Sequence, residues 1–204
     1  MTYPLHPPEK DRTQTFEEDT AILLAEELGF TEAWVEQHHT AAWEPIPSND
    51  LFVSSLIPQT TNIRLGTGVS ILPQHHPANI APQLAYLDHL SRGRLNVGFG
   101  QGGVPTDWGL FDLPDPRTQG LMTLEAIELI MYLWQAEPPF DFKGEYWRSR
   151  IDETVPELGL GELLRPYQQP HPPIAMSIVK SASMAARMAG QRGYTPVSTN
   201  IVPG

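Results

Sequence analysis

The chain has 204 residues, and its 13 lysines and arginines against 24 aspartates and glutamates give a formal net charge of −11. Hydrophobic residues make up 40% and charged residues 18%, which is the composition of a globular domain and not of a disordered segment. The acidic balance argues against nucleic acid or an anionic membrane as partner, and the absence of cysteine excludes disulfides, thiolate metal sites and cysteine catalysis. No apolar run reaches the roughly 20 residues of a membrane span. The Pro-rich first ten residues lack the regions of a signal peptide, so we expect a cytoplasmic protein.

The first half of the chain alternates helix and strand signals. Residues 15–18 have the spacing of a capping box, and the apolar positions that follow predict a helix that stops at Gly29. β-branched and apolar runs between turn residues predict strands, and apolar spacings of three and four predict helices. In chain order we expect a strand over 31–36, a helix over 49–59, a strand over 62–71, a helix over 79–90 and a strand over 94–99.

The second half repeats this alternation after a long loop. A Gly- and Pro-rich loop is expected to run to about Thr118, and the apolar stripe over 121–134 predicts the strongest helix of the chain. Residues 137–173 are expected to form an insertion, with a hairpin over 140–147 that has Gly144 in its turn and a Pro-rich stretch after it. The pattern ends with a strand over 173–179, a helix over 183–191 and a strand over 195–199.

Alternating strands and helices predict an α/β protein with a parallel sheet covered by helices. Gly98, Gly100 and Gly103 match the GxGxxG pattern of dinucleotide-binding turns. Such a turn must open a helix, whereas residues 104–108 are expected to continue a Pro-rich loop. The distinctive residues gather in loops at the carboxyl ends of strands, as they do in barrel enzymes. A parallel barrel is therefore favoured over a doubly wound sheet.

Five short motifs occur in a fixed order along the chain: EQHH at 36–39, LGTGV at 65–69, LPQHHP at 72–77, LDHLSRGR at 87–94 and GFG at 98–100. Together they closely resemble the bacterial luciferase-like flavin-dependent monooxygenases. Within that superfamily, PLHPP at 4–8 and PHPPI at 170–174 are most similar to the limonene and alkane monooxygenase branch.

The resemblance implies an enzyme that binds reduced FMN, reacts it with O2 and inserts one oxygen atom into a small hydrophobic substrate, a terpene, an alkane or an aldehyde. A separate flavin reductase would supply the reduced FMN, and the full-length chain is expected to form a homodimer. Two alternatives stay open. One is a deazaflavin-dependent oxidoreductase that transfers hydride on the same fold, and the other is a flavin-binding fragment without catalysis.

The resemblance also implies a (β/α)8 TIM barrel, against which the predicted strands can be numbered. Residues 1–5 supply only part of strand one, the next four predicted strands supply two to five, and 195–199 supplies strand six. A full barrel usually needs about 250 residues. Residues 1–204 are therefore expected to form a single incomplete barrel domain that lacks strands seven and eight.

Two pairs of adjacent histidines are candidates for proton transfer or metal binding. His38 and His39 follow a strand, where successive side chains point to opposite faces, so only one of them is expected to face the site. On the residues alone a structural, hydrogen-bonded histidine is favoured, but the resemblance identifies His38 as catalytic, leaving His39 structural. His75 and His76 lack the separated spacing of zinc ligands, so no metal is expected, and they would shape the loop before the next helix.

Three residues at the end of one strand are expected to hold the cofactor ring. The resemblance implies that Thr67, Gly68 and Val69 lie against the isoalloxazine, with a cis peptide bond between Gly68 and Val69. Glycine lets the backbone approach a flat ring closely. The alternative is an ordinary strand with small residues for packing.

The phosphate end of the cofactor is expected near a helix start. Ser181 and Ser183 offer hydroxyls beside unpaired helix N–H groups, and Gln101 takes the place of a family arginine. Lys180 departs from the family pattern, which has an acidic residue there. The serines could instead act only as helix caps.

Large apolar residues in the loops after two strands are candidates for a substrate pocket. Trp43, Trp108, Leu110 and Phe111 could line a dry cavity, or they could be half-buried packing residues.

Overall fold

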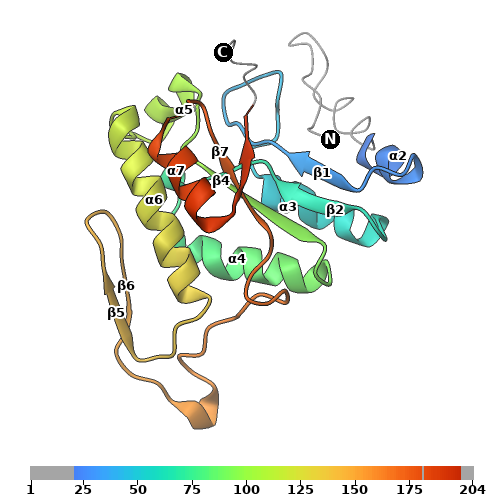
Figure 1. Cartoon of the computed structure of the whole chain (residues 1–204). Coiled ribbons are helices and arrows are strands. Elements are labelled where there is room, and N and C mark those ends of the chain that lie inside the picture. The colour runs from blue at the N-terminus through green and yellow to red at the C-terminus, as the bar shows by residue number, and fades with distance from the viewer. Residues whose placement is uncertain (1–20, 181, 199–204) are drawn as a thin grey trace.

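The computed structural model describes residues 21–180 and 182–198, in which helices and strands alternate as expected (Figure 1). The helices are α2 (Ala21–Glu27), α3 (Asn49–Leu56), α4 (Pro77–Leu90), α5 (Pro105–Leu110), α6 (Pro116–Leu133) and α7 (Met184–Arg192). The strands are β1 (Glu32–Val35), β2 (Arg64–Thr67), β3 (Ser70–Ile71), β4 (Leu95–Gly100), β5 (Phe140–Lys143), β6 (Arg148–Ile151), β7 (Ile174–Ser177) and β8 (Thr195–Val197). The predicted capping box at 15–18 and Ser181 lie outside the described residues.

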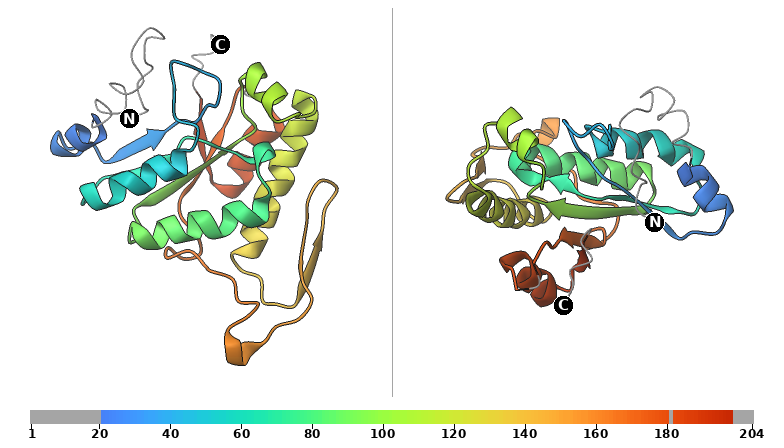
Figure 2. Two further views of the ribbon diagram at one scale, coloured as in Figure 1. Left: turned by 180° about the vertical axis from the view of Figure 1, so that it is seen from behind. Right: turned by 90° about the horizontal axis from the view of Figure 1, so that it is seen from above.

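A curled parallel sheet organises the molecule. Its strand order is β1-β2-β4-β7-β8, with β3 paired to β4, and every pairing within it is parallel. Helices α3, α4 and α6 cover the convex face, and α7 packs beside β7 and β8 (Figure 2). This open half-barrel confirms the predicted fold class. No helix in the described part of the chain is long and apolar enough to cross a membrane.

The strand expected over 62–71 is divided in two. Gly68 and Val69 separate β2 from β3, and the peptide bond between them is cis, as the resemblance implies. The Thr67 hydroxyl accepts a hydrogen bond from the Gly98 N–H at 3.0 Å and so ties β2 to β4 at this point. Strand β2 pairs with the first half of β4, whereas β3 pairs with its last two residues.

Alternate residues of β1 point to opposite faces of the sheet. Ala33 and Val35 are buried in the core beneath α3, and Trp34 points to the concave face. The Trp34 ring lies directly on Gly66 of the neighbouring strand, where a Cβ would overlap it. Glycine at position 66 therefore lets a large ring lie flat on the sheet.

Glycines of β4 have the same effect around Val69. A Cβ on Gly98 would overlap the Thr67 carbonyl, and a Cβ on Gly100 would overlap the Val69 side chain. Two of the three glycines that matched GxGxxG, Gly98 and Gly100, thus serve close packing within the sheet, whereas Gly103 lies beyond β4. Trp34 on Gly66, and Val69 on Gly98 and Gly100, thus place apolar side chains against glycines on the concave face.

The prediction of an uninterrupted loop after β4 is wrong. Residues 105–110 form α5, so the expectation that 104–108 would not open a helix is also wrong. Proline at the first position of α5 suits a helix start, because it needs no N–H there and its φ is already helical. Helix α6 also begins earlier than expected, because Asp115 caps it by accepting from the N–H groups of Arg117 and Thr118.

The hairpin of the predicted insertion is confirmed, with its second strand somewhat later than expected. Strand β5 pairs with β6 in antiparallel register from Phe140–Ile151 to Lys143–Arg148. The Glu125 carboxylate of α6 accepts from the backbone N–H groups of residues 145, 146 and 147. A Cβ on Gly144 would overlap this carboxylate, so glycine in the turn leaves room for Glu125.

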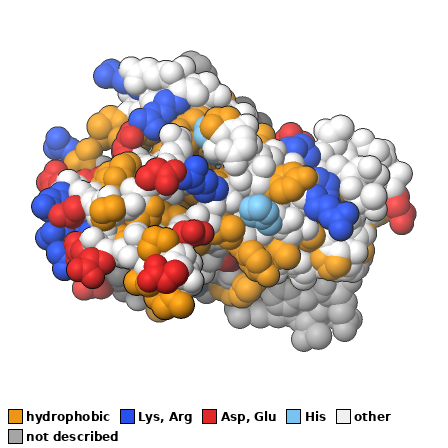
Figure 3. Space-filling model, turned by 90° about the horizontal axis from the view of Figure 1, so that it is seen from below, with side chains coloured by type: hydrophobic (Ala, Val, Ile, Leu, Met, Phe, Trp, Pro, Cys, Tyr) orange, Lys and Arg blue, Asp and Glu red, His pale blue; other side chains and the backbone are white. Residues whose placement is uncertain are grey.

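The hairpin is charged on its surface and the segment after it returns to the sheet. Asp141 lies 2.7 Å from Lys143 and 3.3 Å from Arg148, and Figure 3 shows such mixed charges among apolar side chains on the lower face. Exposed ion pairs of this kind stabilise little.

The segment after the hairpin is fixed to α4. Gln168 donates to Asp88 through its backbone N–H at 2.8 Å and through its side-chain amide at 2.7 Å, which holds the returning segment beneath α4.

Candidate active site

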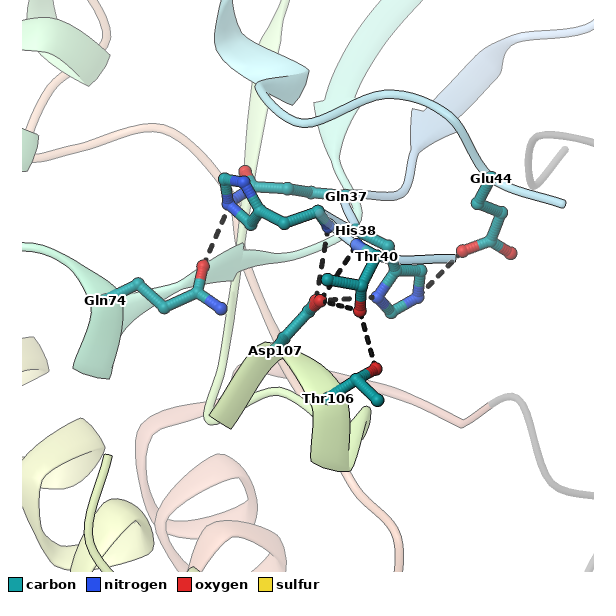
Figure 4. A network of polar contacts seen from close by, with 8 residues as sticks. Gln37, His38, Thr40, Glu44, Gln74, Thr106 and Asp107 are labelled. Carbon is teal, nitrogen blue, oxygen red and sulfur yellow. Dashed lines mark hydrogen bonds and ion pairs between the residues drawn. The ribbon is translucent and has the colours of Figure 1, made fainter. Parts of the chain in front are cut away.

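The loop after β1 carries polar residues along the rim where the parallel strands end (Figure 4). The alternation of β1 continues into this loop: Gln37 is buried, whereas Glu36 and His38 are partly exposed on the side of Trp34. The backbone N–H of His38 donates to the Ile46 carbonyl at 3.0 Å, and this hydrogen bond joins the two ends of the loop. His38 therefore lies at the carboxyl rim of the concave face, where barrel enzymes carry their sites.

Two carboxylates face the two ring nitrogens of His38. Nε2 lies 2.8 Å from Oε2 of Glu44, and Nδ1 lies 3.6 Å from Oδ2 of Asp107, an ion-pair distance longer than a hydrogen bond. Burial lowers the pKa of His38, but Glu44, Asp107 and Glu36 outweigh it, so the net shift is upward. The geometry favours the doubly protonated imidazolium near neutral pH.

Asp107 joins α5 to the loop that carries His38. Its carboxylate accepts from the N–H of His39 at 3.2 Å, from the N–H of Thr40 at 2.9 Å, and from the Thr40 hydroxyl. The side chain is almost fully buried. Burial raises its pKa, yet these hydrogen bonds and the His38 charge prevail and hold the pKa of Asp107 below its ordinary value. Asp107 is therefore ionised over the whole physiological range.

His39 lies in a different environment from His38. Its ring packs edge-on against Phe111, with centroids 4.7 Å apart. Its Nε2 is buried and has no hydrogen-bond partner within the described residues. The described contact of the His39 ring is thus a packing contact, and its structural role stays a prediction. Of the second pair, His76 caps α4 by accepting from the Ala78 N–H at 3.2 Å.

Sequence reasoning missed Glu36, Glu44 and Asp107. Glu36 belongs to the EQHH motif, where only the histidines were weighed. The signal for the other two was weak, because each is a single acidic residue a few positions after a motif, with no spacing that links it to His38. Only the fold brings them together around His38.

The strand-end residues expected to hold a flavin ring lie beside this rim. Thr67 is fully buried, and its hydroxyl is bound to both backbone groups of Gly98, so the side chain is occupied within the sheet. Val69 lies over Gly98 and Gly100 on the concave face. The expected contact of these residues with an isoalloxazine stays a prediction.

The described residues expected at the phosphate follow two other strands of the sheet: Gln101 follows β4, and Lys180 and Ser183 follow β7. Ser183 caps α7 by accepting from the Ala186 N–H at 3.1 Å, which is the capping role held open as the alternative, and its O–H can still donate. Lys180 is exposed, and the Gln101 amide packs against Gly120 of α6. Ser181 lies outside the described residues.

The four apolar residues expected in the substrate pocket are not gathered into one cavity. Trp43 and Leu110 are exposed, whereas Trp108 and Phe111 are half-buried. Two cavities of about 210 and 250 Å³ lie instead among the helices of the convex side, one by α4 and α6 and one between α3 and α4. None of the four residues lines either cavity.

The residues present fit a flavin mononucleotide. A planar ring needs a flat apolar surface, and Trp34 and Val69 provide one on a floor of glycines. The buried Trp108 Nε1–H has no partner among the described residues and is available as a donor. After β7, the start of α7 offers backbone N–H groups of the kind that bind phosphate.

Comparisons with known proteins give the family of the chain. The luciferase-like monooxygenase family matches residues 8–200. The chain is 34% identical over 201 residues to 4-hydroxyprotoasukamycin monooxygenase of Streptomyces nodosus subsp. asukaensis, covering 98% of this chain and 52% of that protein. It is 34% identical over 135 residues to limonene 1,2-monooxygenase of Rhodococcus erythropolis, covering 66% of this chain and 35% of that protein.

A solved structure has the same fold. It is the oxygenating constituent of 3,6-diketocamphane monooxygenase from Pseudomonas putida, a type II Baeyer–Villiger monooxygenase in complex with FMN. The TM-score is 0.87 at 26% identity, and the match covers 97% of this chain and 56% of that one. The chain thus spans about half the length of several of the proteins it matches. It belongs to the luciferase-like monooxygenase family.

Proposed function

We propose that this chain carries the catalytic rim of an FMN-dependent monooxygenase that uses reduced FMN and O2 to oxygenate a small hydrophobic substrate. One observation carries the proposal: His38 is fixed between Glu44 and Asp107 at the strand ends, directly beside a flat apolar surface. A histidine held in this way can move a proton at the edge of a bound ring.

The relatives support the same chemistry. The matched proteins are named as monooxygenases, and the solved structure contains FMN. That structure is described as an oxygenating constituent, which supports a second protein as the source of reduced flavin. A flavin reductase is accordingly the proposed partner, and the full-length protein is proposed to be a homodimer.

Reduced FMN would supply the electrons that activate O2. His38 is the residue proposed to hold and move the proton, because its imidazolium is stabilised by both carboxylates. Gly68 and Val69 would support the ring. Ser183, with Ser181 and the start of α7, would bind the phosphate, and Gln101 would lie near it.

The substrate is proposed to be a terpene, an alkane, an aldehyde or a similarly apolar compound. Trp43, Trp108, Leu110 and Phe111 are the side chains proposed to bind it and to exclude water from the reacting atoms. The exposure of Trp43 and Leu110 makes them available for this contact.

Oxygen labelling with the full chain tests the proposal. Reduced FMN, ¹⁸O₂ and either limonene or a long-chain aldehyde are added, and the product is examined for one labelled oxygen atom by mass spectrometry. Incorporation in the wild-type chain, and its loss in His38→Ala, is the expected result.

The two competing functions give different outcomes in the same experiment. A deazaflavin-dependent oxidoreductase would transfer hydride from the reduced deazaflavin without consuming O2. A binding fragment would retain FMN in an equilibrium titration and give no product with either cofactor. Either result overturns the proposed oxygenation.

A further inference from the structure

Three titratable side chains converge at the end of β1, and only His38 has a role in the proposed reaction. The ligand-type atoms of Glu36, His38 and Glu44 all lie within 4.8 Å of one another. Glu44 is buried, with 4% of its surface exposed, and Glu36 and His38 are half-buried. Glu36 lies on the concave side, because it follows the alternation of Trp34.

The closeness of the two glutamates disfavours the ionisation of both at once. Two carboxylates a few ångströms apart and partly shielded from water repel each other, so one takes up a proton. Glu44 is the one that stays ionised, because its Oε2 lies 2.8 Å from the His38 ring. Burial, a hydrogen bond with Glu44 and the charge of Glu44 raise the pKa of Glu36 to about 8, against an opposing effect of His38.

One further charged group, Asp107, faces the His38 ring. Asp107 faces Nδ1 from α5 and is kept ionised by its own hydrogen bonds, so it takes no proton from the cluster. Among the described residues, the charged groups that face the cluster are therefore Asp107 and the three members themselves.

We propose that Glu36 is a positioning residue: it acts as a neutral carboxylic acid that donates a hydrogen bond to Glu44 and so holds Glu44 on Nε2 of His38. The proposal rests on the proposed function only for the catalytic role of His38. When Glu36 loses its proton to solvent, the donor becomes a second anion. Glu44 is then repelled, and the orientation of the His38 ring is no longer fixed. The protonation of Glu36 thus sets an alkaline limit for the site.

Glu36→Gln separates this role from a merely structural one. Glutamine has nearly the same shape, stays neutral and can still donate to Glu44. Activity near pH 7 should change by less than about threefold, whereas the alkaline limb of the pH–rate profile near pH 8 should disappear or move up by at least about one unit. Glu36→Leu removes the donor and should lower activity about tenfold at neutral pH.

Glu32→Gln is the matched control. Glu32 is a carboxylate on the same strand and the same face, where it accepts from the Trp34 indole at 3.1 Å, and a glutamine oxygen can accept there too. Its pH–rate profile should equal that of the wild type. An unchanged alkaline limb in Glu36→Gln, or an equal shift in Glu32→Gln, would overturn the proposal.

A second measurement needs no flavin and no turnover. In the full chain labelled with ¹⁵N-histidine, the ring signals of His38, assigned by their loss in His38→Ala, should show an inflection near pH 8 that Glu36→Gln abolishes. Should Glu36→Gln fail to fold, the inflection in the wild type decides, and its absence sinks the proposal. Loss of oxygenation with this inflection intact would count against the proposed function and leave the role of Glu36 standing.

Discussion

Asp107 accepts a hydrogen bond from the Thr40 N–H at 2.9 Å and another from the Thr40 hydroxyl, and so joins two segments 67 positions apart. The first segment is the loop that carries His38, and the second is the short helix α5. A hydrogen-bonded, buried carboxylate at this point keeps the loop in place at the rim of the sheet. The position of His38, the proposed catalytic residue, therefore depends on α5, a helix that follows β4.

Asp107→Asn should destabilise the protein. The amide accepts through only one oxygen and carries no charge, so an N–H of His39 or Thr40 is left poorly paired. The free energy of unfolding should fall by about 1–3 kcal/mol, measured by urea denaturation. Asp152→Asn, on an exposed carboxylate 3.4 Å from Arg150, is the control and should stay within about 0.5 kcal/mol. Equal stability of the two variants would show that Asp107 does not fasten the loop.

His38→Ala should lower oxygenation by about 10²–10⁴-fold, because a positioned proton transfer is lost. Reduced flavin and O2 should then yield free hydrogen peroxide, which a peroxidase-coupled assay detects. FMN affinity should change little, since the proposed phosphate residues lie elsewhere. These assays are best made in a chain that includes a complete barrel, so that folding does not limit the rate.

His39→Ala provides the comparison for the neighbouring histidine. The substitution removes the ring that packs on Phe111. It should therefore lower the free energy of unfolding while changing the rate of the chemical step little. A normal product yield in His38→Ala together with its loss in His39→Ala would mean that His39 is the residue that faces the substrate.

Gly98→Ala should be strongly destabilising. Its Cβ would overlap the Thr67 carbonyl, which is backbone and cannot rotate away, so the pairing of β2 and β4 would have to shift. A cost of about 1–3 kcal/mol or more is expected in urea denaturation. Gly190→Ala in α7 meets nothing within 4 Å among the described residues and should instead stabilise by about 0.5–1 kcal/mol. The same sign for both variants would contradict the packing described for the concave face.

The free energy of unfolding should fall as pH rises from about 5 to about 8 through the contribution of Glu36. Its pKa is raised from 4.5 to about 8 in the folded chain, so the folded state holds a proton that the unfolded state releases in this window. The raised pKa of His38 acts in the same direction above its unfolded value of 6.5. Urea midpoints at several pH values should show a smaller slope in Glu36→Gln. An identical slope would mean that Glu36 is ionised in the folded protein.

Asp107 acts at the opposite end of the pH scale. Its pKa is lowered, so its stabilisation is present above the unfolded pKa and is lost as pH falls through the folded pKa. Acid unfolding of Asp107→Asn should consequently be less steep than that of the wild type.

The sequence by itself determined the local elements and the class of fold. Periods of two and of three to four residues, with glycines at the turns, located most strands and helices and the hairpin that turns at Gly144, because these signals depend only on near neighbours in the chain. The cis bond between Gly68 and Val69 came from the family motif and not from any physical pattern in the residues. Helix α5 is not predicted by the sequence pattern, because glycines and prolines on both sides of it are typical of a loop, although its own Pro105 favours a helix start.

Only the tertiary structure decided what surrounds His38. Glu44 reaches the ring from the loop after β1 and Asp107 from helix α5, and their carboxylates favour its charged form, but no spacing in the sequence marks them as partners. The same holds for Trp34 lying on Gly66 and for the Thr67 hydroxyl bound to Gly98, since both contacts depend on strand register. Hydrophobic periodicity fixes which face of a strand is buried, whereas charge pairing and close packing depend on which distant segments the curled sheet brings together.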